Sequence, residues 1–218
     1  MIHRDDTYKP AEDVEGELQT SGRRGIRTAF GALLLALVAM LGVRFAVQHS
    51  LIRSDGLSYY AYMPSAFIDG DLDFTNQFRD HNPHGDGVPN IDRKTPTGLV
   101  PNKYPIGQAL LWAPFFIAAH WLVLGSQALG ASVAAHGYSP PYHLAIGLGS
   151  LFYGWLGLLG CYRLSLRFHR PWPSALAVVA VALASNLVYY LTVEPAMSHA
   201  LSMFAVTFFA SSVPTALA

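Results

Sequence analysis

The stretch TAFGALLLALVAMLGVRFAVQ, residues 28–48, decides the class of fold. Arg44 is its one charged residue. An apolar helix of about 20 residues crosses the roughly 30 Å hydrocarbon core of a bilayer. Residues 29–48 are therefore predicted to form a transmembrane helix. Arg44 lies near the end of that helix, where its long side chain either extends toward the interface or faces the protein interior.

The composition indicates that most of the chain shares this character. Hydrophobic residues make up 52% of the sequence and charged residues only 13%, which is too apolar for a typical soluble domain. The apolar residues are gathered in long blocks, as in membrane helices. We expect an all-α fold, a polytopic transmembrane helix bundle, whose further apolar segments cover residues 105–128, 143–164, 174–193 and 197–218.

The N-terminal flank sets the predicted orientation. Residues 1–28 are polar and mixed in charge, and they are predicted to form a disordered cytoplasmic tail. Arg23, Arg24 and Arg27 stand directly before the first apolar segment, and arginines beside a membrane helix favour the cytoplasmic side. Residues 49–104 are therefore expected to form a loop on the outer face.

A second arginine-rich stretch, YRLSLRFHRP at residues 162–171, complicates a simple count of crossings. The same charge bias places it inside, which requires that the 105–128 segment does not fully cross. That segment contains two prolines and is predicted to be broken or re-entrant, with a complete crossing as the alternative. The re-entrant arrangement puts residues 194–199 on the outer side.

The outer loop opens with SDGLSYYAYMPSAFI, residues 54–68. We predict an amphipathic helix lying at the membrane interface, because Asp55, Tyr59 and Tyr62 would share one face at helical spacing. The rest of the loop, up to residue 104, is rich in Gly, Pro, Asn and Asp and indicates turns.

Asp55 is the first candidate functional residue. A carboxylate at the outer mouth of a helix bundle can accept a proton from a hydroxyl group or bind a divalent metal. The alternative is a helix N-cap, since Ser-Asp-Gly is a favourable capping sequence. The following Tyr59 and Tyr60 are equally typical of the aromatic belt at a membrane interface.

Lys103 and Tyr104 are the next candidates, in NKYPIG immediately before an apolar helix that Pro105 is suited to begin. A lysine at a helix N-terminus on the membrane surface favours phosphate binding, because its charge adds to the exposed N–H groups and the helix dipole. A juxtamembrane anchor is the alternative reading of the same residues.

The EPAMSHA string places further ionisable residues at a break between two apolar blocks. Ionisable groups at membrane depth usually face a cavity or a partner. Glu194 and Ser198 are one helical turn apart with His199 beside them, so these side chains are expected to converge on one ligand. A capped helix junction is the alternative.

Other classes of site have weak support. Asp69, Asp71 and Asp73 resemble the opening of an EF-hand, but Phe74 stands where that loop needs glycine, so a solvated turn is favoured. The net charge of zero excludes an overall field that attracts nucleic acid. The single Cys161 excludes an internal disulfide.

Three strings together resemble the N-terminal part of GT-C-type glycosyltransferases, close to bacterial membrane proteins of that superfamily. These strings are DGLSYYAYMPSAFIDGDLDF (55–74), NKYPIGQALLWAPFF (102–116) and EPAMSHAL (194–201). Such enzymes take a sugar from a polyprenyl-phosphate carrier, as protein O-mannosyltransferases and lipid A aminoarabinose transferases do. The resemblance implies a bacterial inner-membrane protein with a cytoplasmic N-terminus.

The resemblance also implies roles for residues. Asp55 would be the catalytic carboxylate, acting as general base toward the acceptor or as ligand of a divalent metal. The substrates, a polyprenyl-phosphate-linked sugar and its acceptor, would be bound by Tyr59, Tyr60, Lys103, Tyr104, Glu194 and His199. The expected function is sugar transfer on the outer face of the membrane.

Members of that superfamily have many more helices than five apolar segments provide, so the chain is expected to be truncated at its C-terminus. The alternative function is a non-catalytic membrane scaffold, or a transporter fragment in which Arg44, Asp55 and Glu194 line a polar path.

Overall fold

A computed structural model describes residues 11–82 and 90–213. Within these residues every regular element is helical and no strand occurs, as the composition predicts. In chain order the elements are α1 (Ala11–Gln48), α2 (Asp55–Tyr60), α3 (Tyr62–Pro64), the π-helical segment η1 (Ser65–Asp69), α4 (Thr75–Asp80), α5 (Gly107–Ala128), α6 (Pro140–Ser165), α7 (Pro171–Ala184), α8 (Leu187–Thr192) and α9 (His199–Ser212).

Three helices are long and apolar enough to cross a membrane. They are the Thr20–Gln48 part of α1, all of α5 and all of α6. The broken helix predicted over 105–128 is instead continuous, since α5 runs for 22 residues through Pro114. A proline inside a helix removes one backbone hydrogen bond without ending the helix when packing on neighbouring helices holds it, and Trp112 and Phe116 on either side of Pro114 are fully buried.

The N-terminal boundary of the first helix also differs from the prediction. Residues 11–28, predicted to be disordered, belong to α1, which begins at Ala11. The sequence AEDVEGELQ consists mostly of residues with good helix propensity, and the adjoining apolar segment provides a helix that it can extend. Residues 1–10 of the predicted tail lie outside the described residues.

The single span predicted over 174–193 is divided in the structure. α7 has 14 residues, about 21 Å at 1.5 Å per residue, and α8 follows only after a break at Ser185. Ser185 is extended, and its hydroxyl accepts a hydrogen bond from the Leu187 N–H at 3.3 Å, so the side chain competes with the helical backbone. α9 is also 14 residues long, where the sequence predicted a span over 197–218.

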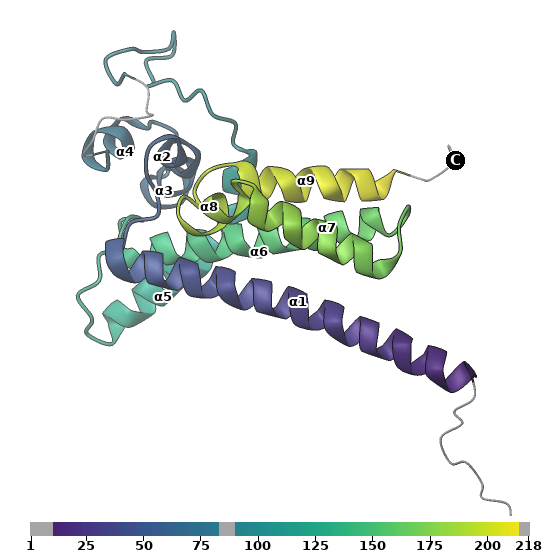
Figure 1. Cartoon of the computed structure of the whole chain (residues 1–218). Helices are drawn as coiled ribbons and strands as arrows, with labels where there is room; N and C mark the ends of the chain where they lie inside the picture. Colours follow the sequence, from purple (N-terminus) through teal and green to yellow (C-terminus); the bar gives the residue numbers. More distant parts are fainter. Residues whose placement is uncertain (1–10, 83–89, 214–218) are drawn as a thin grey trace, which may run out of the picture.

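α6 is the central helix of the bundle, lying between α1 and α9 (Figure 1). Its first half packs against α5, where the Trp112 indole N–H donates to Ser150 Oγ at 2.9 Å. Its second half packs against α9 through glycines at positions 154, 157 and 160. Glycines at helical spacing let two helix backbones approach closely.

Gly157→Ala is expected to destabilise the bundle by about 1–3 kcal/mol, the usual cost of overpacking. A methyl group there would lie 3.0 Å from the backbone nitrogen of Phe204, which cannot move without shifting α9. The midpoint of thermal unfolding in detergent measures the effect. Gly125→Ala, in open space on α5, is the matched control and should leave the midpoint unchanged or slightly higher. Equal midpoints for the two variants would show that the α6–α9 approach is not tight.

The helix predicted over residues 54–68 is present but is divided into α2, α3 and η1, and much of it is buried. Leu57 and Met63 belong to the core, whereas Phe67 is exposed. α2 and α3 pack on α5, so this segment is one layer of the bundle rather than a helix lying free at its surface. The rest of the loop, predicted as turns, also contains the short helix α4.

Candidate functional site around Asp55

Tyr104 is the centre of a cluster formed by the loop between α1 and α5. Burial, together with the Asp55 carboxylate acting on its hydroxyl, raises the pKa of Tyr104. Its ring lies against that of Tyr59 at a centroid distance of 4.5 Å, and its carbonyl accepts a hydrogen bond of 2.6 Å from the Tyr62 hydroxyl. Asp55, Tyr59 and Tyr62 therefore share the face that meets Tyr104, as their spacing predicts.

The segment before Tyr104 is fixed on the same helices. The Asn102 amide donates to the Ser58 carbonyl at 2.8 Å, and its oxygen accepts from the Tyr104 N–H at 3.1 Å. Lys103, between them, is exposed, with Nζ 4.9 Å from the Tyr104 ring centroid. A cation over an aromatic face is a favourable contact, and here it holds the ammonium near the Asp55 cluster.

Electrostatics keep Tyr104 neutral beside Asp55. Burial and the Asp55 carboxylate both raise the pKa of Tyr104 above its ordinary value. The phenol therefore stays protonated at neutral pH. Asp55 is not a helix cap, because Ser54 holds the N-cap position of α2 and no side-chain capping hydrogen bond is present there.

The turn between α8 and α9 packs directly on the start of α2. A methyl group at Gly56 would lie 2.7 Å from Cβ of Ala196, so only glycine allows this approach. The turn is held from the bundle side as well, since Gln108 donates to the Ala196 carbonyl at 3.0 Å and Ser150 donates to the Pro195 carbonyl at 2.6 Å. The three strings, residues 55–74, 102–116 and 194–201, thus meet at one place.

Glu194 begins this turn and forms an ion pair with Arg53, with Nη2 and Oε1 3.3 Å apart. Burial and the Glu194 carboxylate, which acts on the Tyr189 hydroxyl, raise the pKa of Tyr189. Arg44 faces inward: both of its Nη atoms are shielded and have no hydrogen-bond partner among the described residues, and Arg53 and Glu194 are among the charges that act on it. Glu194 is therefore paired with Arg53, and Arg44 is a second positive charge in the same region.

The side chains of Glu194, Ser198 and His199 were predicted to converge, but the structure does not bring them together. The His199 ring stacks on Tyr190 at 3.6 Å, and no hydrogen bond or ion pair joins it to Glu194 within the described ranges. Ser198 instead lines a cavity with Tyr59. The turn at Pro195 separates these side chains, because it interrupts the helix whose spacing had placed them on one face.

Tyr60 is a core residue. It has no exposed surface, its ring packs against Phe116 and Tyr138, and its hydroxyl donates to the Gly137 carbonyl. Tyr60 is therefore a packing residue in this structure, and the substrate-binding role predicted for it stays a prediction. Its neighbour Tyr59 is half-buried and stays accessible beside Tyr104.

Two cavities adjoin the first outer loop. One, of about 770 Å³, is lined by Arg53, Ser54 and Glu194 together with residues of α4 and α6. The other, of about 330 Å³, lies between the beginnings of α5 and α9 and is lined by Tyr59 and Ser198. Both volumes fall in the range of small-molecule sites.

The structure assigns the aspartates after η1 to turn formation. Asp71 Oδ1 accepts hydrogen bonds from Ser65 and from the backbone of Asp73, and Asp73 Oδ1 accepts from Thr75. Among the residues that the structure describes, no group of three or more His, Cys, Asp or Glu side chains is arranged to hold a metal ion. A metal at Asp55 would therefore need ligands from the substrate or from other parts of the protein.

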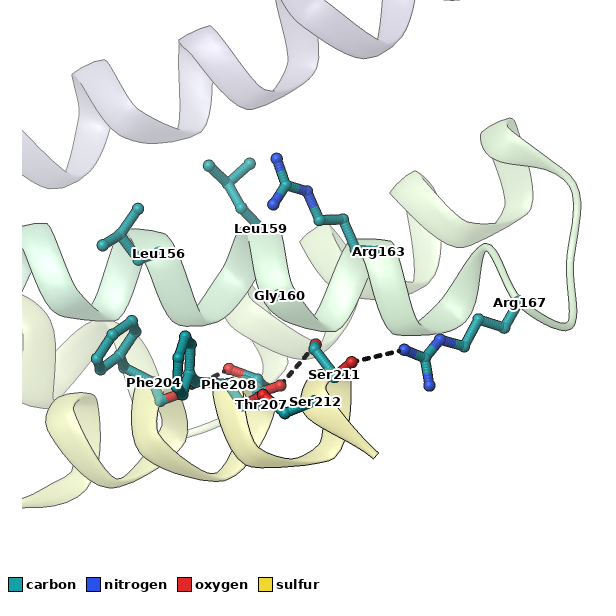
Figure 2. A pocket seen from close by; sticks show the side chains of 10 residues that line it. All are labelled: Leu156, Leu159, Gly160, Arg163, Arg167, Phe204, Thr207, Phe208, Ser211 and Ser212. Atoms are coloured by element: carbon teal, nitrogen blue, oxygen red, sulfur yellow. Dashed lines mark hydrogen bonds between the residues drawn. The ribbon is translucent and has the colours of Figure 1, made fainter. Parts of the chain in front are cut away.

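A separate cavity of about 400 Å³ lies between the C-terminal halves of α6 and α9 (Figure 2). Arg163 and Arg167 line it, and Arg167 donates to the Ser211 carbonyl at 3.0 Å. None of the predicted site residues contributes to this cavity.

Several residues that build the site were not predicted from the sequence. Arg53, Gln108 and Ser150 all bond to the 194–196 turn, which is distant from each of them in sequence. Gln108 and Ser150 are polar residues in otherwise apolar helices, and that exception is the signal that could have identified them.

His143 fixes the segment that leads into Asp55. Its Nδ1 accepts hydrogen bonds from the backbone N–H groups of Leu51 at 3.1 Å and Ile52 at 3.2 Å, and its Nε2 lies 3.1 Å from the Tyr138 carbonyl. Because Nδ1 is an acceptor and Nε2 must then carry the proton, the ring is neutral in this arrangement.

His143→Ala is expected to lower the free energy of unfolding by about 2–3 kcal/mol, because two buried N–H groups lose their acceptor. Thermal unfolding in detergent tests this, and faster proteolysis within residues 49–54 should accompany the loss. His169→Ala, at an exposed histidine, is the control and should change neither measurement. An unchanged midpoint for His143→Ala would mean that water replaces the ring nitrogen.

No family model matches this chain, and no curated protein or solved structure is significantly similar to it. The described residues form an all-helical bundle with three helices able to cross a membrane. Asp55, Tyr104 and Lys103 lie together near the Arg53–Glu194 ion pair.

Proposed function

We propose that this protein is an integral membrane glycosyltransferase, or the N-terminal part of one, that transfers a sugar from a polyprenyl-phosphate carrier to an acceptor. The observation that carries the proposal is the meeting of three distant strings at Asp55, namely residues 55–74, 102–116 and 194–201. These are the same strings whose sequence resembles GT-C-type enzymes. The site would lie on the outer face of a bacterial inner membrane, with the N-terminus in the cytoplasm.

Asp55 is the group that activates the acceptor in this proposal. The acceptor hydroxyl oxygen forms a bond to the anomeric carbon while its proton passes to the Asp55 carboxylate. The bond between the anomeric carbon and the phosphate oxygen breaks, and the carrier leaves as polyprenyl phosphate. Tyr104 is compatible with this role because its phenol stays protonated beside the carboxylate, which leaves Asp55 as the proton acceptor.

Lys103 and two arginines near the 194–196 turn supply the positive charge that the leaving phosphate requires. The exposed Lys103 ammonium lies above the Tyr104 ring, and Arg53 and Arg44 add a second region of positive charge. Cationic groups placed where negative charge develops stabilise the transition state. Arg53 and Glu194 are partly exposed, at 39% and 29%, so their ion pair contributes little stability and its main effect is on position.

The direct test compares membranes from the source organism with and without a functional gene for this chain. Polyprenyl-phosphate sugars extracted from that organism and radiolabelled in the sugar serve as donor. The proposal predicts label in the acceptor fraction, and release of polyprenyl phosphate, only when the gene is intact. Equal transfer by both membranes contradicts it and favours the alternative of a scaffold or transporter component.

A further inference from the structure

A basic groove lies between residues 22–27 of α1 and the beginning of α7. Figure 1 shows that the beginning of α7 is at the far end of the bundle from α2. Two adjoining cavities, of about 730 and 410 Å³, form the groove. Arg23, Ile26 and Pro171 line both cavities, Arg170 lines the larger, and Arg27 and Tyr162 line the smaller. Two arginines of α1 and one directly before α7 thus surround one depression.

These arginines lack protein partners. Arg23 and Arg27 are one helical turn apart on α1, Arg170 directly precedes α7, and all three are exposed. No ion pair or side-chain hydrogen bond joins any of them to another residue in the parts of the chain that the structure describes. The groove therefore has three positive charges that no described carboxylate balances.

The floor and outer edge of the groove are apolar. The Trp172 ring lies over Gly25 of α1, where a methyl group would be 3.5 Å away, and 52% of Trp172 remains exposed. Leu176, one turn further along α7, is 61% exposed. Tryptophan and tyrosine are enriched at the headgroup level of membranes, and exposed leucine beyond them suits the acyl chains.

We propose that this groove binds the headgroup of an anionic phospholipid, with the lipid phosphate held by Arg23, Arg27 and Arg170 and the acyl chains lying along Trp172 and Leu176. Guanidinium groups match the geometry of phosphate oxygens and form two parallel hydrogen bonds to them. Basic pockets between membrane helices bind such headgroups. A free phosphate or an acidic peptide would leave the apolar edge unused. The inference is independent of sugar transfer at Asp55.

Native mass spectrometry of the protein released from nanodiscs tests the proposal. The nanodiscs contain an equimolar mixture of phosphatidylglycerol and phosphatidylcholine, and the measured quantity is the ratio of the two lipids retained. The wild type should retain phosphatidylglycerol preferentially. Arg23→Gln/Arg170→Gln should reduce that preference by roughly twenty-five-fold, since each arginine near an anionic surface contributes a factor of about five.

The matched control is Arg163→Gln/Arg167→Gln, which removes two charges near the same end but from the cavity of Figure 2. It should keep the wild-type preference. An equal loss in both double variants, or no preference in the wild type, overturns the proposal. If free glycerol phosphate binds the groove when the protein is in phosphatidylcholine nanodiscs, the claim that the ligand is a membrane lipid is contradicted.

A second measurement guards against misfolding of the variant. Phosphatidylglycerol should raise the thermal midpoint of the wild type relative to pure phosphatidylcholine, because a ligand that binds only the folded state stabilises it. Arg23→Gln/Arg170→Gln should match the wild type in phosphatidylcholine and lose only the increment. A midpoint of the wild type that is independent of lipid charge contradicts the proposal.

Discussion

Asp55→Asn is expected to reduce sugar transfer by roughly 10²–10⁴-fold, the range that one general base contributes. The amide has nearly the shape of the carboxylate and leaves the contacts of Tyr104 with Tyr59 and Tyr62 in place, so the protein should accumulate in the membrane at its normal level. What it cannot do is take the proton of the acceptor. The loss should therefore appear in the turnover rate rather than in the amount of protein.

The measurement is transfer of radiolabelled sugar by membranes in which the chromosomal gene carries the substitution. Asp92→Asn is the matched control, because Asp92 is an exposed aspartate of the same loop and has no contact with the Tyr104 cluster. Full activity in Asp55→Asn would remove the general base from the mechanism. Loss in both variants would indicate a general effect on the loop.

Tyr60→Ala should give the largest loss of stability, about 3–5 kcal/mol, because a fully buried ring is replaced by a cavity. The ring fills the space between Phe116 and Tyr138, and its hydroxyl satisfies the Gly137 carbonyl. Thermal unfolding in detergent should show a clearly lower midpoint, together with reduced accumulation in the membrane.

Tyr59→Ala separates the two neighbouring tyrosines. Tyr59 is only half-buried and contacts Tyr104 and a cavity, so its replacement should affect transfer more than stability. A Tyr60→Ala protein as stable as the wild type, with reduced transfer only, would restore the substrate-binding role that the sequence suggested for this residue.

Local sequence was sufficient for the helical class and for the face of the first loop helix. Apolar length is a local property, so the apolar segments in α1, α5 and α6 could be predicted from the sequence, although the continuity of α5 and the start of α1 could not. The shared face of Asp55, Tyr59 and Tyr62 follows from helical periodicity. Periodicity also places Tyr60 on a different side of the helix from Tyr59, but only the structure shows that protein covers that side.

The remaining differences arise from tertiary contacts. The partner of Glu194 is Arg53, and no local pattern pairs residues so far apart in sequence. Likewise, Ser185 interrupts an apolar block with one polar side chain, a signal that hydropathy averaged over a window does not register. Arg44 could be placed near the helix end, but its inward direction depends on α8.

The contact between Gly56 and Ala196 has a consequence for the order in which the protein is made. The ribosome synthesises the loop that follows α1 long before the turn at Pro195, so during most of translation α2 lacks one of the surfaces on which it packs. The Ser150 and Gln108 side chains are likewise made before the carbonyl groups that they bind. Asp55 is therefore synthesised early but reaches its final environment only when the turn before α9 has been made. A nascent chain stopped before residue 194 should carry a first loop that proteases can still cleave.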